Sequence, residues 1–100
     1  MHIEHWSDEW GELSERSMRK RLEREGYVVT RYDYPSGTYF PDHTHSFDKK
    51  DAVVSGRFLI RAGGREFLLG PGDALAVPAG TVHRAEVIGD ETVVSLDASR

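Results

Sequence analysis

The chain of 100 residues contains no cysteine. This absence excludes disulfide bonds, thiolate zinc sites and cysteine nucleophiles, so any bound metal must use nitrogen and oxygen ligands. The sequence also lacks an apolar run near the roughly 20 residues that a membrane span needs. Its first residues show neither the basic region nor the apolar region of a signal peptide. We therefore expect a cytoplasmic protein that does not enter membranes.

An excess of basic residues is missing as well. The formal net charge is −4, from 13 lysines and arginines against 17 aspartates and glutamates. Non-specific binding to nucleic acids depends on basic patches that neutralise phosphates, so we expect no nucleic-acid partner. The one basic run, residues 16–24, is interleaved with glutamates and indicates a solvated helix face. The length allows a single domain with one modest core.

Residues 7–25 are the only stretch with helical character. Acidic residues precede basic residues along it, which is the order that complements the helix dipole. The apolar stripe is not continuous, because Trp6 and Trp10 share one face whereas Met18 lies on another, and Gly11 weakens the middle. We expect either a broken helix or a helix whose two faces bury against different neighbours, one of them a second subunit.

From residue 27 onward, short runs with a period of two residues are separated by glycine and proline. So many short strands in so short a chain predict a small β-barrel or sandwich, which removes or protects sheet edges. We expect an all-β domain over residues 27–100, preceded by a helical segment, residues 1–26, that packs on this domain or on a partner subunit. The expected strands are 27–34, 38–43, 52–55, 57–62, 66–69, 74–77, 83–88 and 92–97.

Three histidines have the pattern of a metal site. His43 and His45 are two residues apart and would point to the same side of an extended strand. His83 shares the alternation of Ala85 and Val87, so its side chain should point into the apolar interior, where an imidazole needs a partner. We expect the three imidazoles to bind a divalent metal, for which zinc, iron, nickel, copper and manganese are all compatible.

Two segments resemble the paired motifs of the cupin superfamily, G-x5-H-x-H-x3,4-E-x6-G and G-x5-P-x-G-x2-H-x3-N. The resemblance implies a small β-barrel or jelly roll of two antiparallel sheets, with a divalent metal held inside by the motif histidines. Together with the two apolar helix faces, it also implies a homodimer. The residues at the matching motif positions are Gly37, His43, His45, Gly56, Gly72, Pro78, Gly80 and His83.

The glutamate of the first motif is absent. Lys49 and Lys50 occupy its two permitted positions, and Val87 replaces the final asparagine of the second motif. An ammonium group beside a divalent cation is repelled unless it loses its proton or turns aside. Three arrangements remain open. The three histidines are completed by water, Asp48 or Asp51 supplies the carboxylate, or Lys49 replaces the function of the metal.

The resemblance permits two main classes of function. The first is a metalloenzyme that acts on a small molecule, such as a dioxygenase or an isomerase, with Lys49 and Asp48 or Asp51 as candidate acid or base groups. The second is a non-enzymatic module that binds or senses a small molecule and reports it through the N-terminal helix. A storage or structural protein has no need of three inward histidines. The fold hosts so many reactions that it does not identify a substrate.

Overall fold

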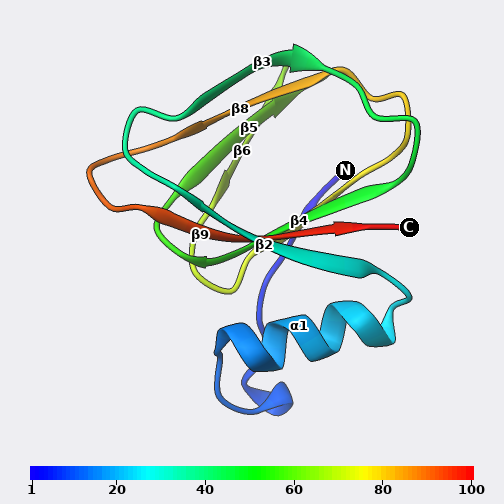
Figure 1. The fold of residues 1–100 in the computed structure, drawn as a ribbon, viewed down its shortest axis with the longest axis vertical. Coiled ribbons are helices and arrows are strands. Elements are labelled where there is room, and N and C mark those ends of the chain that lie inside the picture. Colours follow the sequence, from blue (N-terminus) through cyan, green and yellow to red (C-terminus); the bar gives the residue numbers. More distant parts are fainter.

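The computed structural model describes residues 1–100 as two β-sheets and one α-helix (Figure 1). The five-stranded sheet has the order β1-β7-β4-β9-β2, the four-stranded sheet has the order β3-β8-β5-β6, and every strand pair is antiparallel. The expected jelly roll of two antiparallel sheets is confirmed. The elements are β1 (Ile3–Glu4), the 3-10 helix η1 (Asp8–Trp10), α1 (Glu15–Arg24), β2 (Val28–Tyr34), β3 (Tyr39–His43), β4 (Lys49–Ser55), β5 (Phe58–Ala62), β6 (Arg65–Leu69), β7 (Ala74–Val77), β8 (His83–Val87) and β9 (Val93–Ser99).

The observed strands differ most from the expected ones at β4. This strand begins at Lys49, three residues before the predicted start at Ala52. Lys49, Lys50 and Asp51 have poor strand propensity, but each pairs with both β7 and β9, and pairing on both sides overrides propensity. The two-residue strand β1, which pairs with β7 at the sheet edge, was not predicted.

The N-terminal segment is broken, which is one of the two expected arrangements. The 3-10 helix ends at Trp10 and is capped by Gly11, which has a φ of 87°, and α1 begins only after Ser14. The Ser14 hydroxyl accepts a hydrogen bond from the backbone N–H of Ser17, and the Ser17 hydroxyl accepts one from the backbone N–H of Ser14. This reciprocal cap fixes the start of the helix. No helix of the structure has the length and apolar character needed to cross a membrane.

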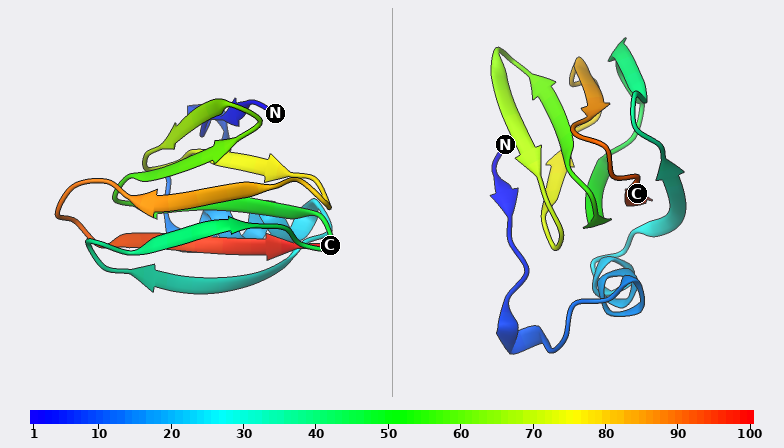
Figure 2. Two further views of the ribbon diagram at one scale, coloured as in Figure 1. Left: turned by 90° about the horizontal axis from the view of Figure 1, so that it is seen from above. Right: turned by 90° about the vertical axis from the view of Figure 1, so that its left-hand side faces the viewer.

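The central strands of the five-stranded sheet, β4, β7 and β9, carry buried residues, and the sheet packs against other elements on both faces (Figure 2). One face packs against the four-stranded sheet, and ten buried side chains form the core between them, including Phe58, Ile60, Ala85 and Val87. The other face packs against α1. The buried residues on this side are Met18, Leu22, Tyr27, Ala52, Leu96 and Ala98.

The two glycines of the first motif differ in their surroundings. Both have a positive φ, 88° at Gly37 and 84° at Gly56. A Cβ atom at Gly56 would lie 2.8 Å from the carbonyl oxygen of Thr92 and 2.9 Å from the Cα of Val93, whereas one at Gly37 would meet nothing within 4 Å. Close backbone contact, in addition to the backbone conformation, therefore requires glycine at position 56.

We predict that Gly56→Ala destabilises the protein more than Gly37→Ala does. The positive φ should cost each variant about 1–2 kcal/mol of unfolding free energy. The collision with the backbone at Thr92 should cost Gly56→Ala roughly 1–3 kcal/mol more. Urea unfolding followed by tryptophan fluorescence measures both losses, and equal losses would contradict the close contact at Gly56.

Candidate metal centre

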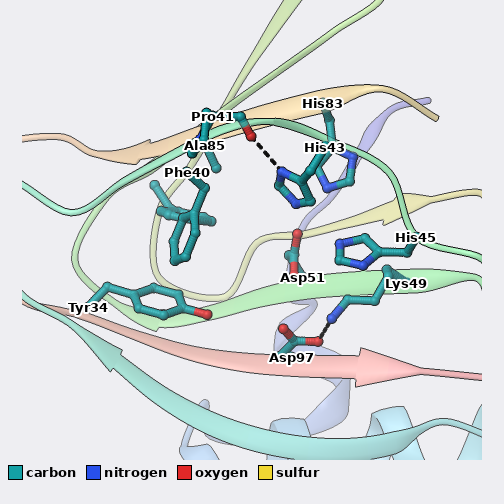
Figure 3. Close-up of a pocket in the computed structure, with 11 residues that line it drawn as sticks. Tyr34, Phe40, Pro41, His43, His45, Lys49, Asp51, His83, Ala85 and Asp97 are labelled. Carbon is teal, nitrogen blue, oxygen red and sulfur yellow. Dashed lines mark hydrogen bonds and ion pairs between the residues drawn. The ribbon is translucent and has the colours of Figure 1, made fainter. Parts of the chain in front are cut away.

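A pocket of about 340 Å³ lies between the two sheets (Figure 3). One side of it is aromatic, where the ring centroid of Tyr34 lies 5.0 Å from that of Phe40 and 5.5 Å from that of Phe58. The other side is polar, so the pocket presents chemically active groups next to an apolar wall. The polar side chains that line it are His43, His45, Lys49, Asp51, His83 and Asp97.

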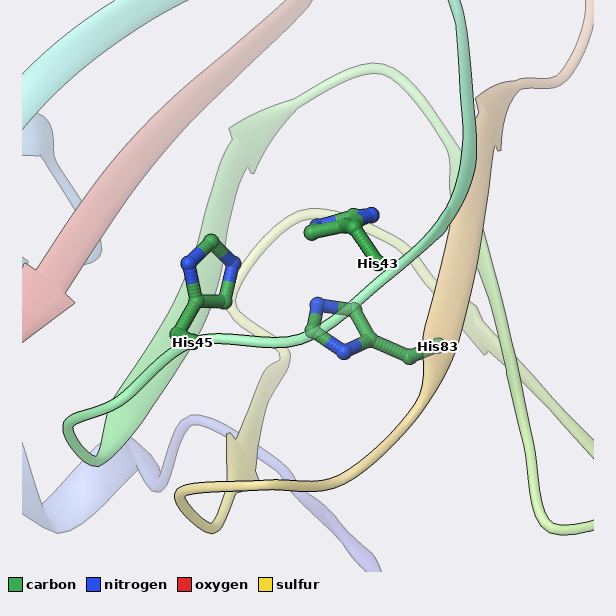
Figure 4. A group of neighbouring side chains, drawn as sticks. All are labelled: His43, His45 and His83. Carbon is green, nitrogen blue, oxygen red and sulfur yellow. The ribbon is translucent and has the colours of Figure 1, made fainter.

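The three predicted histidines converge in this pocket (Figure 4). His43 is the last residue of β3 and pairs directly with His83, the first residue of β8. His45 lies in the loop after β3, and its carbonyl accepts a hydrogen bond of 2.9 Å from the backbone N–H of Gly80. One ligand nitrogen from each imidazole lies within 4.8 Å of the others. The inward orientation expected for His83 is confirmed, since this residue is only 4% exposed.

An irregularity in β3 turns His43 toward the pocket. Phe40 and His43 are three residues apart, but their partners on β8 are only two residues apart. Strict alternation from the inward Phe40 would place Asp42 on the inner face and His43 on the outer face. The extra residue falls next to Pro41, which has no N–H to donate to the neighbouring strand. The insertion shifts the inward and outward alternation of the side chains by one position.

Backbone carbonyls fix the tautomers of two of the imidazoles. Nδ1 of His43 lies 2.7 Å from the carbonyl oxygen of Pro41, and Nδ1 of His83 lies 2.9 Å from that of Thr81. A carbonyl oxygen only accepts hydrogen bonds, so Nδ1 carries a proton in both rings, and Nε2 is the nitrogen whose lone pair is free when the ring is neutral. Metal-ligating histidines are typically oriented by such a second hydrogen bond.

The donor set fits a divalent metal ion. Nitrogens at about 2.1 Å from one tetrahedral ion lie roughly 3.4 Å apart. One ligand nitrogen from each imidazole already lies within 4.8 Å of the others. Burial, followed by repulsion from the charge of Lys49 and from the neighbouring imidazoles when they are protonated, lowers the pKa of His45. Imidazole nitrogens are suitable ligands for zinc, copper, nickel and iron.

Lys49 points into the pocket, where an ion pair joins its Nζ to the carboxylate of Asp97 on β9. The Lys49 side chain is only 10% exposed. Burial lowers the pKa of Lys49, and the nearby Asp51 opposes this effect. Because Asp97 neutralises the ammonium group, Lys49 does not face the histidines as an uncompensated charge.

The two aspartates considered as substitutes for the missing glutamate lie in different places. The Asp48 carboxylate accepts a hydrogen bond of 2.9 Å from the backbone N–H of Ala79 and does not line the pocket. Asp51 lines the pocket, and its carboxylate forms no hydrogen bond or ion pair (Figure 3). Burial raises the pKa of Asp51, against the opposing effect of Lys49 and the histidines.

Asp97 and Tyr34 are pocket residues that the sequence did not reveal. On β9, Ser95 and Asp97 alternate with Leu96 and Ala98, a pattern that usually indicates polar residues in solvent and apolar residues in the core. Here α1 covers the apolar face, so Asp97 points into the pocket instead. The amphipathic helix was the available signal in the sequence. When such a helix packs on a sheet, the apolar residues of a strand face the helix and the polar residues face the other sheet. No motif marks Tyr34.

Comparison with known proteins identifies related sequences and structures. The family described as "Cupin domain" matches residues 30–99. The fold is similar to that of KdgF from Halomonas sp. (27% identity, TM-score 0.64, 73% of this chain and 67% of that one) and to TT1209 from Thermus thermophilus (27%, 0.65, 73% and 70%). It is also similar to the DMSP lyase DddQ from Ruegeria pomeroyi DSS-3 (25%, 0.66, 74% and 38%). No curated protein sequence matches the chain.

We predict that Tyr34 makes the stability of the protein fall at high pH. Burial raises the pKa of Tyr34 to about 12, with further contributions from Asp51 and Tyr32. An unfolded tyrosine ionises near about pH 10, so above this pH the unfolded state releases a proton that the folded state keeps. Folding stability should therefore decrease as the pH rises from about 10 to about 12.

The variant Tyr34→Phe should lose part of this pH dependence, whereas Tyr39→Phe, which changes an exposed tyrosine, should keep it. Urea unfolding measured at steps between about pH 9 and about pH 12 gives the slopes. Identical slopes for the wild-type protein and Tyr34→Phe would show that the Tyr34 phenol is not held neutral by burial.

Proposed function

The chain belongs to the cupin family, and we propose that it binds one divalent metal ion through His43, His45 and His83 and acts on a small molecule in the adjoining pocket. The observation that carries this proposal is the fixed tautomer of His43 and His83. Each donates its Nδ1–H to a backbone carbonyl, so Nε2 is the nitrogen that the neutral ring offers to a metal. A histidine that only filled the core would not need this orientation toward two other imidazoles.

When bound, the metal would supply a Lewis acid that polarises an oxygen atom of the substrate. The chain would supply binding and proton transfer. Phe40 and Phe58 would hold the apolar part of the molecule and exclude water, and the Tyr34 hydroxyl, which stays protonated at neutral pH, would donate a hydrogen bond. We assign proton transfer to Lys49, whose ammonium group forms an ion pair with Asp97.

Asp48 has no part in this scheme, because its carboxylate is held by the backbone of Ala79 outside the pocket. The similarity to a DMSP lyase supports enzymatic action on a small molecule. We propose an isomerase, a dioxygenase or a related enzyme, since the ligand set alone does not select among these reactions.

We predict that the purified protein binds about one divalent ion per chain and that His43→Ala and His83→Ala lose it. Removal of a direct ligand should weaken zinc binding by more than the roughly 10–100-fold that is typical for loss of a residue behind a ligand. Elemental analysis and zinc titration measure the effect. His2→Ala, which changes an exposed histidine far from the motifs, is the matched control and should retain the metal. Stoichiometric metal in both motif variants would disprove the site.

A binding or sensing module without turnover is the second candidate. The observation that favours it is the position of two consecutive lysines on β4. Lys49 points into the pocket, whereas Nζ of Lys50 points to the helix side and lies 2.6 Å from Glu4 and 2.8 Å from Glu25. Because Lys50 pairs with both carboxylates, a displacement of β4 on binding would also move Glu4 on β1 and Glu25 at the end of α1.

For a sensing module, we predict that zinc binding alters hydrogen exchange in α1 as well as in the pocket. In Lys50→Met the change should be confined to the pocket, because this variant lacks the ion pairs to Glu4 and Glu25. Hydrogen–deuterium exchange of the full chain with and without zinc measures the difference. A wild-type response that never reaches α1 would count against reporting through the helix.

A homodimer and a cytoplasmic location stay predictions of the sequence. Val28 and Tyr32 offer a candidate contact surface, since they lie on the edge strand β2 and are 72% and 46% exposed. An unpaired edge strand with apolar side chains is a common place for association between copies of a chain.

A further inference from the structure

Strand β2 forms a free edge of the five-stranded sheet. It pairs only with β9 and is the outermost strand in the left view of Figure 2. Its seven residues pair without a register shift and include no proline, whereas the edge strand β3 contains Pro41 and an irregularity. A long, regular edge strand presents unpaired backbone groups with which another chain can pair.

Alternate residues of β2 direct their backbone groups away from β9. Directly after β9, the backbone N–H groups of Asp48 and Arg100 each donate to the carbonyl of the other residue, so the even-numbered residues of β9 face β4. The odd-numbered residues of β9 therefore face β2. In the register of these two strands, residues 29, 31 and 33 of β2 direct their N–H and C=O groups to the free edge.

The helix already holds one of these three positions. The carbonyl of Val29 accepts a hydrogen bond of 3.0 Å from Nη1 of Arg19 on α1. The backbone groups of Arg31 and Asp33 have no such partner at the edge. The side chains of these two residues carry opposite charges and form an ion pair, with 2.9 Å between Nε and Oδ1.

We propose that a second copy of the chain pairs its β2 antiparallel to this edge, in the register that places Tyr32 opposite the partner's Tyr32. Arg31 then lies opposite the partner's Asp33, and Asp33 lies opposite the partner's Arg31. Each of these two pairs exchanges two backbone hydrogen bonds, as narrow antiparallel pairs do. This inference gives the homodimer expected from the sequence a defined interface, and it does not depend on the metal site.

The charges of β2 select this register. Opposite charges two residues apart are self-complementary around the residue between them, so both cross-strand pairs join an arginine to an aspartate. Centring the pairing on Arg31 or on Asp33 would place two like charges opposite each other. Centring it on Thr30 would require the carbonyl of Val29, which the helix already holds. In the register centred on Tyr32 this carbonyl stays outside the paired segment.

The same pairing brings the partner to the pocket. Tyr34 lines the pocket, and its ring stacks on that of Tyr32 with 5.9 Å between the centroids. In the proposed register the partner's Thr30 lies opposite Tyr34, on the same face of the joined sheets. The partner's Tyr32 lies beside Tyr32, which is 46% exposed in the single chain. The dimer therefore extends the aromatic wall of the pocket.

Sedimentation of the full chain over a range of concentrations tests the proposal. The wild type should form a species of about twice 11.3 kDa. Arg31→Asp and Asp33→Arg should each weaken self-association at least about 10-fold, because each variant places like charges opposite each other in both symmetric pairs. Asp8→Arg, which reverses an exposed charge on η1, is the matched control and should associate like the wild type.

An equimolar mixture of Arg31→Asp and Asp33→Arg separates a specific register from a general effect of charge. In the mixed dimer every cross-strand pair again joins opposite charges. Association in the mixture should therefore return to within about threefold of the wild-type value, although neither variant associates well alone. This recovery also shows that both variants are folded.

The absence of cysteine permits a direct test of the register. Residues opposite each other in a non-hydrogen-bonded antiparallel pair have Cα atoms about 4.5 Å apart, a separation that a disulfide can span. Under mild oxidation Tyr32→Cys should form a disulfide-linked dimer, because residue 32 meets its own copy on the two-fold axis. Thr30→Cys, which lies opposite the partner's Tyr34, is the matched control and should remain uncrosslinked.

A wild-type protein that stays at 11.3 kDa at high concentration would overturn the proposal. So would a mixture that associates no better than its two variants alone, or crosslinking through Thr30→Cys instead of Tyr32→Cys. None of these measurements requires bound metal. The interface and the three-histidine site can therefore fail separately.

Discussion

The packing of the central strands of the five-stranded sheet on both faces is the constraint on which the site depends. One face must pack against α1, and the apolar residues Leu96 and Ala98 of β9 serve this contact. Because side chains alternate, the polar residues of the same strand are directed into the space between the sheets. Asp97 reaches the pocket for this reason, and the histidines on the opposite sheet face a wall that carries charge.

The ion pair of Lys49 and Asp97 makes this charged wall compatible with a metal. Lys49 alone would repel a cation, and Asp97 alone would attract the cation away from the histidines. Together they form an ion pair that is close to neutral. The pocket then combines a neutral ion pair, three imidazoles and the free carboxylate of Asp51 with an aromatic wall. Such a mixture suits a small molecule that has both polar and apolar parts.

The sequence predicted the fold and the three histidines because fixed motif spacings place them regardless of exact strand ends. It did not predict Asp97, because the role of α1 in reversing the faces of β9 is a tertiary effect. His43 was correctly expected on the inner face, but the reason was not foreseen. Strict alternation along β3 would turn this residue outward, and an extra residue in the strand turns it inward. The early start of β4 was missed because pairing with two neighbours, and not propensity, makes Lys49 part of the strand.

The three histidines are not held equally firmly. His43 and His83 pair across two strands and are each tied to a carbonyl, whereas His45 lies in a loop and its ring has no hydrogen bond. An arriving ion would meet two ligands already in place and would gain the third by a movement of one loop. Release of the ion would begin with dissociation from His45. The loop would therefore determine how fast the metal exchanges, and the two strands would determine where the metal binds.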